Sequence, residues 1–544
     1  MTENTYIVTV KKGVDAEEFC HEMESDTTHT DCGCAIDRPV TVEDRQPNSL
    51  RCHTFALTDE EVQTLYSDPR VLAVEPILPE DAKELDGTQT SNFTRSGYWL
   101  GTTSISASDM VNWGLRRCSA IGEQDGLLES GAGGSRDSVV NWTVDHKYNI
   151  DGTGVDIVIQ DNGVLENHPE WLDENGQSRF VQHDWYAAAG VSGTMDNSHY
   201  NGVGNHGTHV AGIAAGRTYG WAKGARIYSM KALGTGKIVG NNVFDLIRLW
   251  HLRKPIDPRT GYKRPTIVNA SWGYRWFHPG TTNDPFTRYG EVNYRGNEAI
   301  QFRGKTYFDM SRPDRISVGI MSSEYQLRQA SVDSAVEDLT DAGVIFVTAA
   351  GNYYGTIFRP GDIEYNNYFT TDIANELGYP AGTRQYYQRG SSPVSDDAIV
   401  VANVDNKVLS FGGNPEKLNL SSDRGPRVDI CAPGTEITSS TDAVGYYRSN
   451  VPYPLDPNFQ IARIAGTSMA APQVTGLLAL YLQLNPQATP QDCKNWLSSN
   501  AETGSLEVTA FDNYGNVTGT RGAPDKFLRN PYDTNIRTKV KQKS

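Results

Sequence analysis

Two histidines stand three positions apart in GNHGTHVAG, a run of small residues at positions 204–212. This spacing places His206 and His209 on one face of a helix, where two imidazoles are able to share a metal. The alternative is that one histidine does chemistry while the other packs. The H-E-x-x-H zinc motif has its histidines four apart and includes a glutamate base, so the metal interpretation lacks its other ligands.

Three further polar groups follow strands or begin a helix in distant parts of the chain. Asp161 ends the apolar run VDIVIQD, and Asn352 follows the run GVIFVTAAG. Ser468, in AGTSMAAPQVTG, stands where a loop meets the N-terminus of a predicted helix. In an open parallel sheet functional groups gather at the carboxyl ends of the strands, so these residues and His206 are expected to converge.

An acid, an imidazole, an amide and a hydroxyl together suit acyl transfer. A serine hydroxyl is a poor nucleophile until an imidazole takes its proton, and a carboxylate must hold that imidazole in the right tautomer. The helix N-terminus behind Ser468 and the side chain of Asn352 supply N–H donors for a developing oxyanion. Taken alone, each residue has a simpler interpretation: Ser468 as a helix cap, and Asp161 and Asn352 as turn residues.

The segments that must position these groups alternate between strands and helices from about residue 150 onward. Short runs that are apolar on both faces predict central parallel strands, and the alternation predicts an α/β domain with a mostly parallel sheet. The predicted strands are VDIVIQD, ARIYSMKAL, PTIVNASWG, GVIFVTAAGN, AIVVANV and VDICAPG, and the predicted helices are NNVFDLIRLWHL, SVDSAVEDLTDA and TSMAAPQVTGLLALYLQL. Residues 274–330 and 353–397 interrupt this pattern with aromatic-rich stretches of little periodicity, and loops of that length are often functional.

The N-terminal region predicts a separate small unit with strands and helices. Its predicted strands are residues 5–10, LRCHTFAL and VLAVEPI, and its predicted helices are DAEEFCHEMES and TDEEVQTLYSD, the second opening with a Thr/Glu capping box. The polar stretch at residues 79–92 that follows is typical of an exposed linker.

The segments around the four polar groups resemble the subtilisin-like serine protease family, in the order Asp, His, Asn, Ser. HGTHVAG and GTSMAAPQVTG are long and specific matches, and VTAAGN, VNASWG and VDICAPG stand where the family's equivalents stand. The stretch GRTYGWAKGARIYSMKAL is most similar to the proteinase K branch. The resemblance covers about residues 145–490, and residues 5–78 resemble the family's inhibitory propeptide.

The resemblance implies a role for each matching residue. Asp161 becomes the orienting acid, His206 the general base, Ser468 the nucleophile and Asn352 the oxyanion donor, with the Ser468 backbone N–H as a second donor. His209, one helical turn beyond His206, then becomes a buried packing residue. The matches to the substrate-binding strand are Ser271, Trp272 and Gly273, and those to the wall of the primary specificity pocket are Ala349, Ala350 and Gly351.

The chain departs from the family pattern in three places. Asn162 follows the acid where the family usually has Ser or Thr. Trp272 replaces a usual aliphatic residue, and both packing and specificity remain open as its role. Residues 274–330 directly follow the substrate strand and are longer than usual, which suits a flap or exosite at the cleft, or else a surface or oligomer-contact insertion.

The fold implied is a subtilisin-like three-layer α/β domain with a mostly parallel central sheet, preceded by a small α+β, ferredoxin-like propeptide domain. The expected divisions are residues 1–85 for the propeptide and folding template, 86–145 for a linker and maturation region, 146–500 for the catalytic domain with its two insertions, and 501–544 for a C-terminal extension. The function implied is a serine endopeptidase made as a zymogen that cuts itself within residues 80–115. A catalytically silent, protease-like structural or binding protein is the alternative. An α/β-hydrolase is excluded, because Ser468 lacks the G-x-S-x-G elbow and the required residue order.

Composition limits the partners and the location. A net charge of −17 argues against a nucleic-acid partner, so polypeptide substrates and the chain's own propeptide, as an intramolecular inhibitor, are the expected partners. Neither a secretory signal nor a membrane-spanning run is expected, and cytoplasmic, lysis-released and virion-associated locations all remain open. Seven cysteines without a signal peptide predict reduced thiols, including the loop Cys32-Gly33-Cys34. The chemistry requires no cofactor, and the resemblance leaves a structural calcium ion open without naming its ligands.

Overall fold

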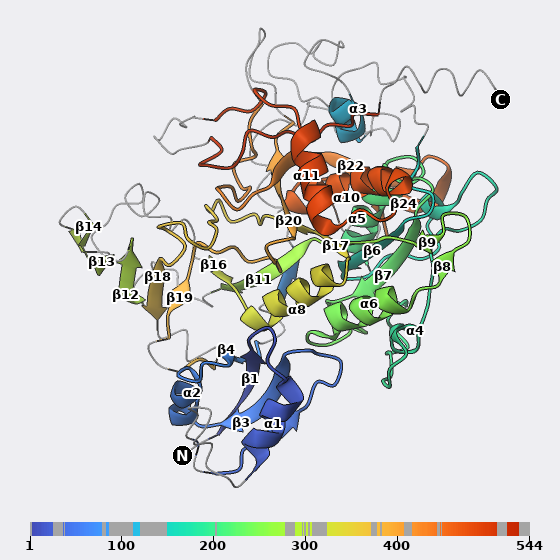
Figure 1. Ribbon diagram of the computed structural model, residues 1–544. Helices are drawn as coiled ribbons and strands as arrows, with labels where there is room; N and C mark the ends of the chain where they lie inside the picture. Colours follow the sequence, from blue (N-terminus) through green and yellow to red (C-terminus); the bar gives the residue numbers. More distant parts are fainter. Residues whose placement is uncertain are drawn as a thin grey trace.

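The computed structural model consists of a small N-terminal unit and a larger body that carries the remaining elements (Figure 1). It describes residues 3–25, 36, 38–78, 83–85, 112–119, 150–201, 204–277, 289–295, 297–298, 301–302, 305–306, 324–371, 378–380, 383–406, 416–442, 447, 449–508 and 519–532. The predicted thiol loop at residues 32–34 lies outside these ranges. Within them, every helix is too short or too polar to cross a membrane.

The N-terminal unit is a four-stranded antiparallel sheet in the order β2-β3-β1-β4. All five predicted elements are confirmed, and the Thr58–Glu61 capping box is present. The edge strand β2 was not predicted, because it is short, polar and largely exposed and has no apolar alternation. The elements are β1 (Asn4–Val10), α1 (Ala16–Glu24), β2 (Thr41–Asp44), β3 (Cys52–Leu57), α2 (Asp59–Leu65) and β4 (Val71–Pro76).

The body is built on a six-stranded sheet in the order β21-β20-β17-β10-β6-β7, in which every neighbouring pair is parallel. Each strand matches one of the predicted apolar runs, so the α/β prediction with a mostly parallel sheet is confirmed. Nearly every residue of these strands is buried, which explains their continuous apolar character. They are β6 (Asp156–Asp161), β7 (Arg226–Lys231), β10 (Thr266–Ala270), β17 (Ile345–Ala349), β20 (Ile399–Val404) and β21 (Ile430–Pro433).

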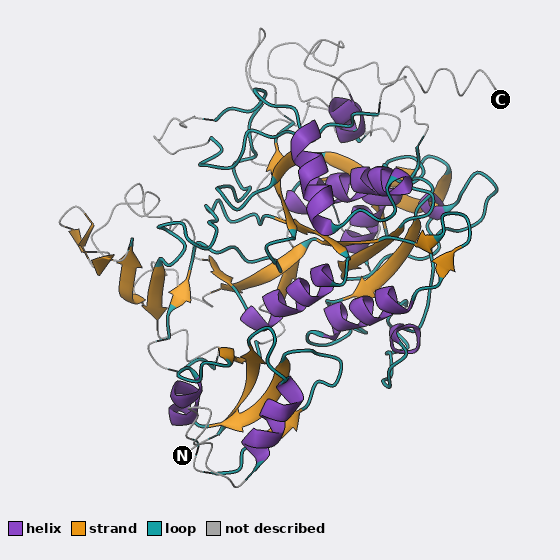
Figure 2. Ribbon diagram, viewed as in Figure 1, coloured by secondary structure: helices purple, strands orange, loops and turns teal. Residues whose placement is uncertain are grey.

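Helices cover both faces of this sheet and make three layers (Figure 2). On one face lie α5 (Asn205–Ala215), α10 (Thr467–Leu484) and α11 (Pro490–Asn500), and on the other lie α6 (Asn242–Arg253) and α8 (Ala330–Asp341). The helices α5 and α10 pack closely, since a Cβ at Gly476 would lie 2.5 Å from the carbonyl oxygen of Ala214. Glycine at position 476 therefore allows the two helices to lie close together.

The two aromatic-rich stretches, predicted to lack periodic structure, contain strands that pair with each other. The strand β12 (Tyr289–Tyr294) of the first stretch pairs antiparallel with β18 (Tyr368–Thr371) of the second. With β13 (Asn297–Glu298) and β19 (Gln385–Tyr386) they form a separate sheet to the side of the body (Figure 1). Residues 278–288 and 307–323 of the first stretch lie outside the described residues.

Residues 112–119, assigned by the sequence to the linker region, pack into the body instead. The helix α3 (Trp113–Ser119) buries Trp113 completely, and the Trp113 indole N–H donates to the carbonyl of Thr435 at 2.9 Å. Its Arg117 forms buried ion pairs with Glu416 (2.7 Å) and Glu502 (2.9 Å). This helix therefore belongs to the core of the body.

Candidate active site

Asp161 and His206 form a buried hydrogen-bonded pair. Both carboxylate oxygens of Asp161, the last residue of β6, lie 2.9 Å from Nδ1 of His206, in the first turn of α5. Both side chains are fully buried. Because a carboxylate only accepts, Nδ1 carries the proton and Nε2 of the neutral ring is left as an acceptor. Among the described residues this Nε2 has no hydrogen-bond partner.

Asn162, one of the three departures from the family pattern, connects the first turn of α5 to the end of β6. Its Oδ1 accepts from the Gly207 N–H at 3.0 Å, and its Nδ2 donates to Oδ1 of Asn205 at 3.0 Å. A Cβ at Gly207 would lie 2.1 Å from the carbonyl oxygen of Gly163, so glycine permits this approach. Asn162 thus positions the turn that carries His206.

Ser468 lies beside the strand that neighbours the Asp161 strand. Pairing of β10 with β6 sets Ala270 opposite Gln160, so the next residues along the two strands are Ser271 and Asp161. Ser468 Oγ donates to the Ser271 carbonyl at 3.3 Å, and Ser271 Oγ donates to the Ser468 carbonyl at 3.2 Å. Adjacent strands are about 4.8 Å apart, so these reciprocal bonds hold Ser468 next to the Asp161–His206 pair.

The Ser468 hydroxyl faces the Ser271 carbonyl, and it makes no hydrogen bond to His206 Nε2. Hydrogen bonds between catalytic groups are often long or misaligned before substrate binds.

Asn352 is held beside Ser468 by the preceding residue, Thr467. Its Oδ1 accepts from the Thr467 N–H at 3.0 Å and from the Thr467 hydroxyl at 3.3 Å. This fixes the amide so that Nδ2 is a free donor, and within the described part of the chain Nδ2 is buried without a partner. Thr467 was not singled out from the sequence, where it is only one letter of the GTS match.

Asp423 holds the loop that carries Asn352. Its carboxylate accepts from the N–H groups of Tyr353 (3.1 Å) and Gly355 (2.6 Å), and its own N–H donates to the Gly351 carbonyl at 2.8 Å. Gly351 has a φ of 111°, and a Cβ there would lie 2.4 Å from Asp423 Oδ2. Asp423 could not be found from the sequence, because this contact depends on two loops that meet in the folded protein.

The residues that match the substrate-binding strand already have a strand beside them. The strand β11 (Trp272–Phe277) pairs antiparallel with β5 (Lys83–Leu85), which sets Trp272 opposite Leu85 and Gly273 opposite Glu84. A peptide segment from near the N-terminal unit therefore occupies the edge that was predicted to receive substrate. On its other side β11 pairs with β16 (Glu324–Leu327).

The side chain of Trp272 lies in the core. It is 1% exposed, its indole N–H donates to Gln160 Oε1 at 3.2 Å, and its ring contacts those of Phe244 and Tyr274. Of the two interpretations left open by the sequence, this environment favours packing. Its backbone alone faces β5.

The three small residues matched to the specificity-pocket wall follow one another at the end of β17. Ala349 and Ala350 are buried, and the Ala350 N–H donates to the Val401 carbonyl at 2.9 Å. Gly351 leads directly to Asn352. Asp161, Ser271 and Asn352 thus lie at the carboxyl ends of β6, β10 and β17, whereas His206 and Ser468 lie in the first turns of α5 and α10.

His209 is a buried packing residue, as predicted. Its Nε2–H donates to the Ala462 carbonyl at 3.0 Å, and its ring contacts Tyr447. Burial lowers the pKa of His209 to about 3. No three His, Cys, Asp or Glu side chains of the described residues are grouped as metal ligands.

Replacing His209 by alanine is expected to lower the free energy of unfolding by about 1–3 kcal/mol while leaving kcat/KM near the wild-type value, because a buried donor is lost. The native protein keeps His209 neutral, whereas the unfolded chain binds a proton below a pH of about 6.5. The stability that this site contributes is therefore complete above pH 6.5 and falls as the pH drops toward 3. When thermal unfolding is measured from pH 8 to pH 4, the stability of His209→Ala should fall less steeply with decreasing pH than that of the wild-type protein. A folded but inactive variant would contradict the assignment.

Comparison with known proteins assigns the chain to a family. Residues 152–522 match the subtilase family. The chain is 26% identical over 502 residues to alkaline serine exoprotease A of Vibrio alginolyticus, covering 90% of this chain and 60% of that protein. It is 24% identical over 394 residues to the cuticle-degrading serine protease of Arthrobotrys oligospora, covering 72% and 64%. Among solved structures, fervidolysin of Fervidobacterium pennivorans, a keratinolytic enzyme related to subtilisin, is 19% identical with a TM-score of 0.47, covering 96% of this chain and 60% of that one.

The chain thus spans about 60% of the length of these relatives. The family match extends over more than half of the chain and includes Asp161, His206, Asn352 and Ser468. The chain therefore belongs to the subtilase family of serine proteases.

Proposed function

We propose that this protein is a serine endopeptidase that acts through Asp161, His206 and Ser468. His206 Nε2 takes the hydroxyl proton as Ser468 Oγ attacks the peptide carbonyl, and Asp161 stabilises the imidazolium. That proton passes to the leaving amine, and a water molecule deprotonated by His206 then releases the acyl-enzyme. Asn352 Nδ2 and the Ser468 N–H hold the oxyanion.

The observation that carries this proposal is a pair of buried polar atoms without partners. His206 Nε2 and Asn352 Nδ2 are both unpaired among the described residues, although each side chain is firmly held at its other end. An unsatisfied buried polar group costs about 1–3 kcal/mol, so a purely structural site would be expected to pair both. Beside Ser468, one of these atoms suits a hydroxyl proton and the other a developing oxyanion.

We propose further that the protein is made as a zymogen and cuts itself. From Lys83 to Leu85, β5 runs antiparallel to β11 and therefore toward Ser271, whose carbonyl accepts from Ser468 Oγ. A chain that continues in this direction reaches the nucleophile. We therefore narrow the expected cut from residues 80–115 to positions 86–88.

The contacts of the N-terminal unit support its role as an intramolecular inhibitor. The Glu75 carboxylate accepts from the N–H groups of Ala330 (2.7 Å) and Ser331 (3.0 Å) at the start of α8, where the helix dipole favours a negative charge. Arg51, which is 4% exposed, pairs with Asp338 of the same helix at 3.1 Å. These contacts hold β4 against α8, and β5 follows β4 directly in the chain.

A fluorophosphonate probe tests both proposals on the same sample. Wild-type protein is expected to be labelled on Ser468, and mass spectrometry should show that the labelled chain begins at a cut within positions 86–88. Ser468→Ala should remain at full length and unlabelled, since it has no nucleophile.

Each contrary outcome has its own meaning. Folded wild-type protein that stays intact and unlabelled would favour a catalytically silent, protease-like binding protein. A chain that is labelled but intact would support the hydrolase proposal and contradict self-cleavage. Equal cutting of Ser468→Ala would assign the cut to another protease.

A further inference from the structure

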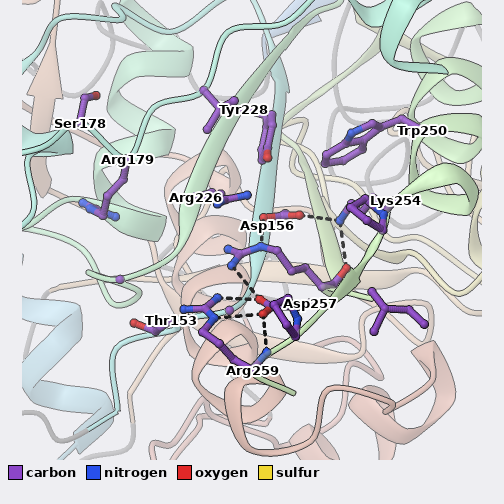
Figure 3. Close-up of a pocket in the computed structure, with 17 residues that line it drawn as sticks. Thr153, Asp156, Ser178, Arg179, Arg226, Tyr228, Trp250, Lys254, Asp257 and Arg259 are labelled. Carbon is purple, nitrogen blue, oxygen red and sulfur yellow. Dashed lines mark hydrogen bonds and ion pairs between the residues drawn. The ribbon is translucent and has the colours of Figure 1, made fainter. Parts of the chain in front are cut away.

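A cavity of about 690 Å³, whose lining is shown in Figure 3, includes Asp156 at the start of β6. Asp156 begins β6 and lines this cavity, whereas Asp161 ends the same strand. A strand rises about 3.3 Å per residue, so roughly 17 Å separates the two ends. The cavity is therefore distinct from the site of peptide hydrolysis.

The cavity has the opposite charge from the protein as a whole. The chain carries a net charge of −17, yet five cationic side chains and only two carboxylates line this space. The cationic residues are Arg179, Arg226, Lys254, Arg259 and Arg264, and the acidic residues are Asp156 and Asp257.

Ion pairs within the lining occupy both carboxylates. Asp156 pairs with Lys254 at 2.7 Å and with Arg264 at 2.6 Å, and Asp257 pairs with Arg259 at 2.6 Å (Figure 3). Asp156, Lys254 and Asp257 are buried, Arg264 is partly buried, and the Arg259 side chain is 57% exposed. The network leaves no unpaired acid in the lining for the remaining cations.

Arg226 and Arg179 form no ion pair with any residue in the described part of the chain. Arg226, the first residue of β7, is exposed at the cavity. Arg179 is 8% exposed; its terminal nitrogens donate to backbone carbonyls, and its Nε is buried without a partner. At Arg226, an anion in the cavity would therefore meet a positive charge that no described carboxylate pairs.

Apolar groups lie between and around these cations. Trp250 and Tyr228 line the interior, and the Lys254 ammonium lies 4.2 Å from the centre of the Trp250 ring. Ile256 of β8 (Ile256–Asp257), which also lines the cavity, is 63% exposed. Tyr262 of β9 (Tyr262–Lys263), which pairs with Asp257 of β8, is 43% exposed. This mixture suits a chain that has both carboxylates and apolar surface. It does not suit a nucleic acid, whose extended phosphate backbone the acidic remainder of the protein would repel.

We propose that this cavity is an exosite that binds an acidic segment of a polypeptide, with Arg226 as its main accessible contact. Its role in substrate choice rests on the proposed peptidase function: a substrate that carries an acidic segment away from its scissile bond would be held at both ends of β6. Such a connection needs at least about five extended residues to span the strand.

Binding is measured with the full chain carrying Ser468→Ala, so that no probe is cut. Fluorescence anisotropy with labelled hexaglutamate, against hexaglutamine of the same length, reports affinity at low and high salt. Arg226→Glu should raise the Kd for hexaglutamate about tenfold, because the contact changes from attraction to repulsion. A higher salt concentration should weaken the binding of hexaglutamate to the protein in which Arg226 is intact. Hexaglutamine should bind neither form.

Arg384→Glu is the matched control. Arg384 is exposed, lies 4.4 Å from the centre of the Tyr368 ring, and forms no ion pair with a described residue. It precedes β19, far from β8 and β9 (Figure 1). This change reverses one surface charge in the same way and should leave the Kd unchanged. Arg226→Gln, with a smaller rise in Kd, replaces Arg226→Glu if circular dichroism shows that the latter is unfolded.

Three results would overturn the proposal: no binding of hexaglutamate, an equal loss of affinity in Arg384→Glu, or tighter binding of a single-stranded oligonucleotide than of the peptide through Arg226. None of them bears on the peptidase proposal, because the assay uses a chain without the nucleophile. Conversely, if the fluorophosphonate probe does not label Ser468 of the wild-type protein, the exosite has no role in substrate choice. The binding of hexaglutamate to the cavity can still be tested in that case.

Discussion

Ser468→Ala is expected to lower kcat for peptide hydrolysis about a million-fold, the loss measured for the equivalent serine of a subtilisin. His206→Ala should have an effect of the same size, since the Ser468 hydroxyl then has no acceptor for its proton. The double variant should be no slower than either single variant, because the two groups act as one unit. The residual rate would come from Asn352 and the substrate-binding strand.

The measurement must separate loss of chemistry from loss of maturation, because an uncut chain keeps β5 on β11. A recognition sequence for an unrelated site-specific protease, inserted after Leu85 in every variant, releases the N-terminal unit equally. Hydrolysis of a fluorogenic peptide is then compared at saturating substrate. His209→Ala serves as the control, since it removes a histidine from the same helix. Additive losses in the double variant would show that His206 and Ser468 act independently and would contradict the mechanism.

Most strands of the central sheet can be predicted from single segments of the sequence. β6, β17 and β20 are buried on both faces, so their composition alone marks them as central strands. The strands β12 and β18 could not be found in this way, because their evidence lies in pairing between segments far apart in the chain. The strand β2 could not be found because it is a short, polar edge strand without apolar alternation. The same is true of α3, which is stabilised by the ion pairs of Arg117 with Glu416 and Glu502.

In the candidate site, too, local features can be predicted from the sequence and tertiary contacts cannot. Asp161, His206, Asn352 and Ser468 could be named because each sits in a local pattern at the end of a strand or the start of a helix. Their mutual geometry could not, since it depends on tertiary contacts.

Two supporting contacts illustrate this limit. Asp423 reaches the Asn352 loop from another loop, and Thr467 orients the Asn352 amide through both its hydroxyl and its N–H. The role of Trp272 was likewise left open until its contact with Gln160 placed the ring in the core. Sequence thus predicts the reacting groups better than the groups that orient them.

Asn352→Ala is expected to lower kcat by about 100- to 1,000-fold with little change in KM, as found for the equivalent asparagine of a subtilisin. Nδ2 has no partner among the described residues, so a free donor awaits the charge that develops on the substrate oxygen. The ground-state carbonyl carries little of that charge, which is why the loss should fall on kcat. Fluorogenic-peptide kinetics on the released body measures both constants.

Two further variants, Thr467→Val and Asn352→Asp, test whether the loss of kcat comes from the Asn352 Nδ2 donor itself. Thr467→Val removes one of the two bonds to Asn352 Oδ1 but keeps the backbone N–H, so kcat should fall by only about tenfold. Asn352→Asp keeps the acceptor for Thr467 and replaces the donor by a negative charge, so it should be at least as slow as Asn352→Ala. Two results would contradict this role: Asn352→Asp that keeps most of the wild-type kcat, or Asn352→Ala that raises KM alone. In either case the free Nδ2 would not be an oxyanion donor. The Ser468 N–H at the start of α10 would then have to hold the oxyanion by itself.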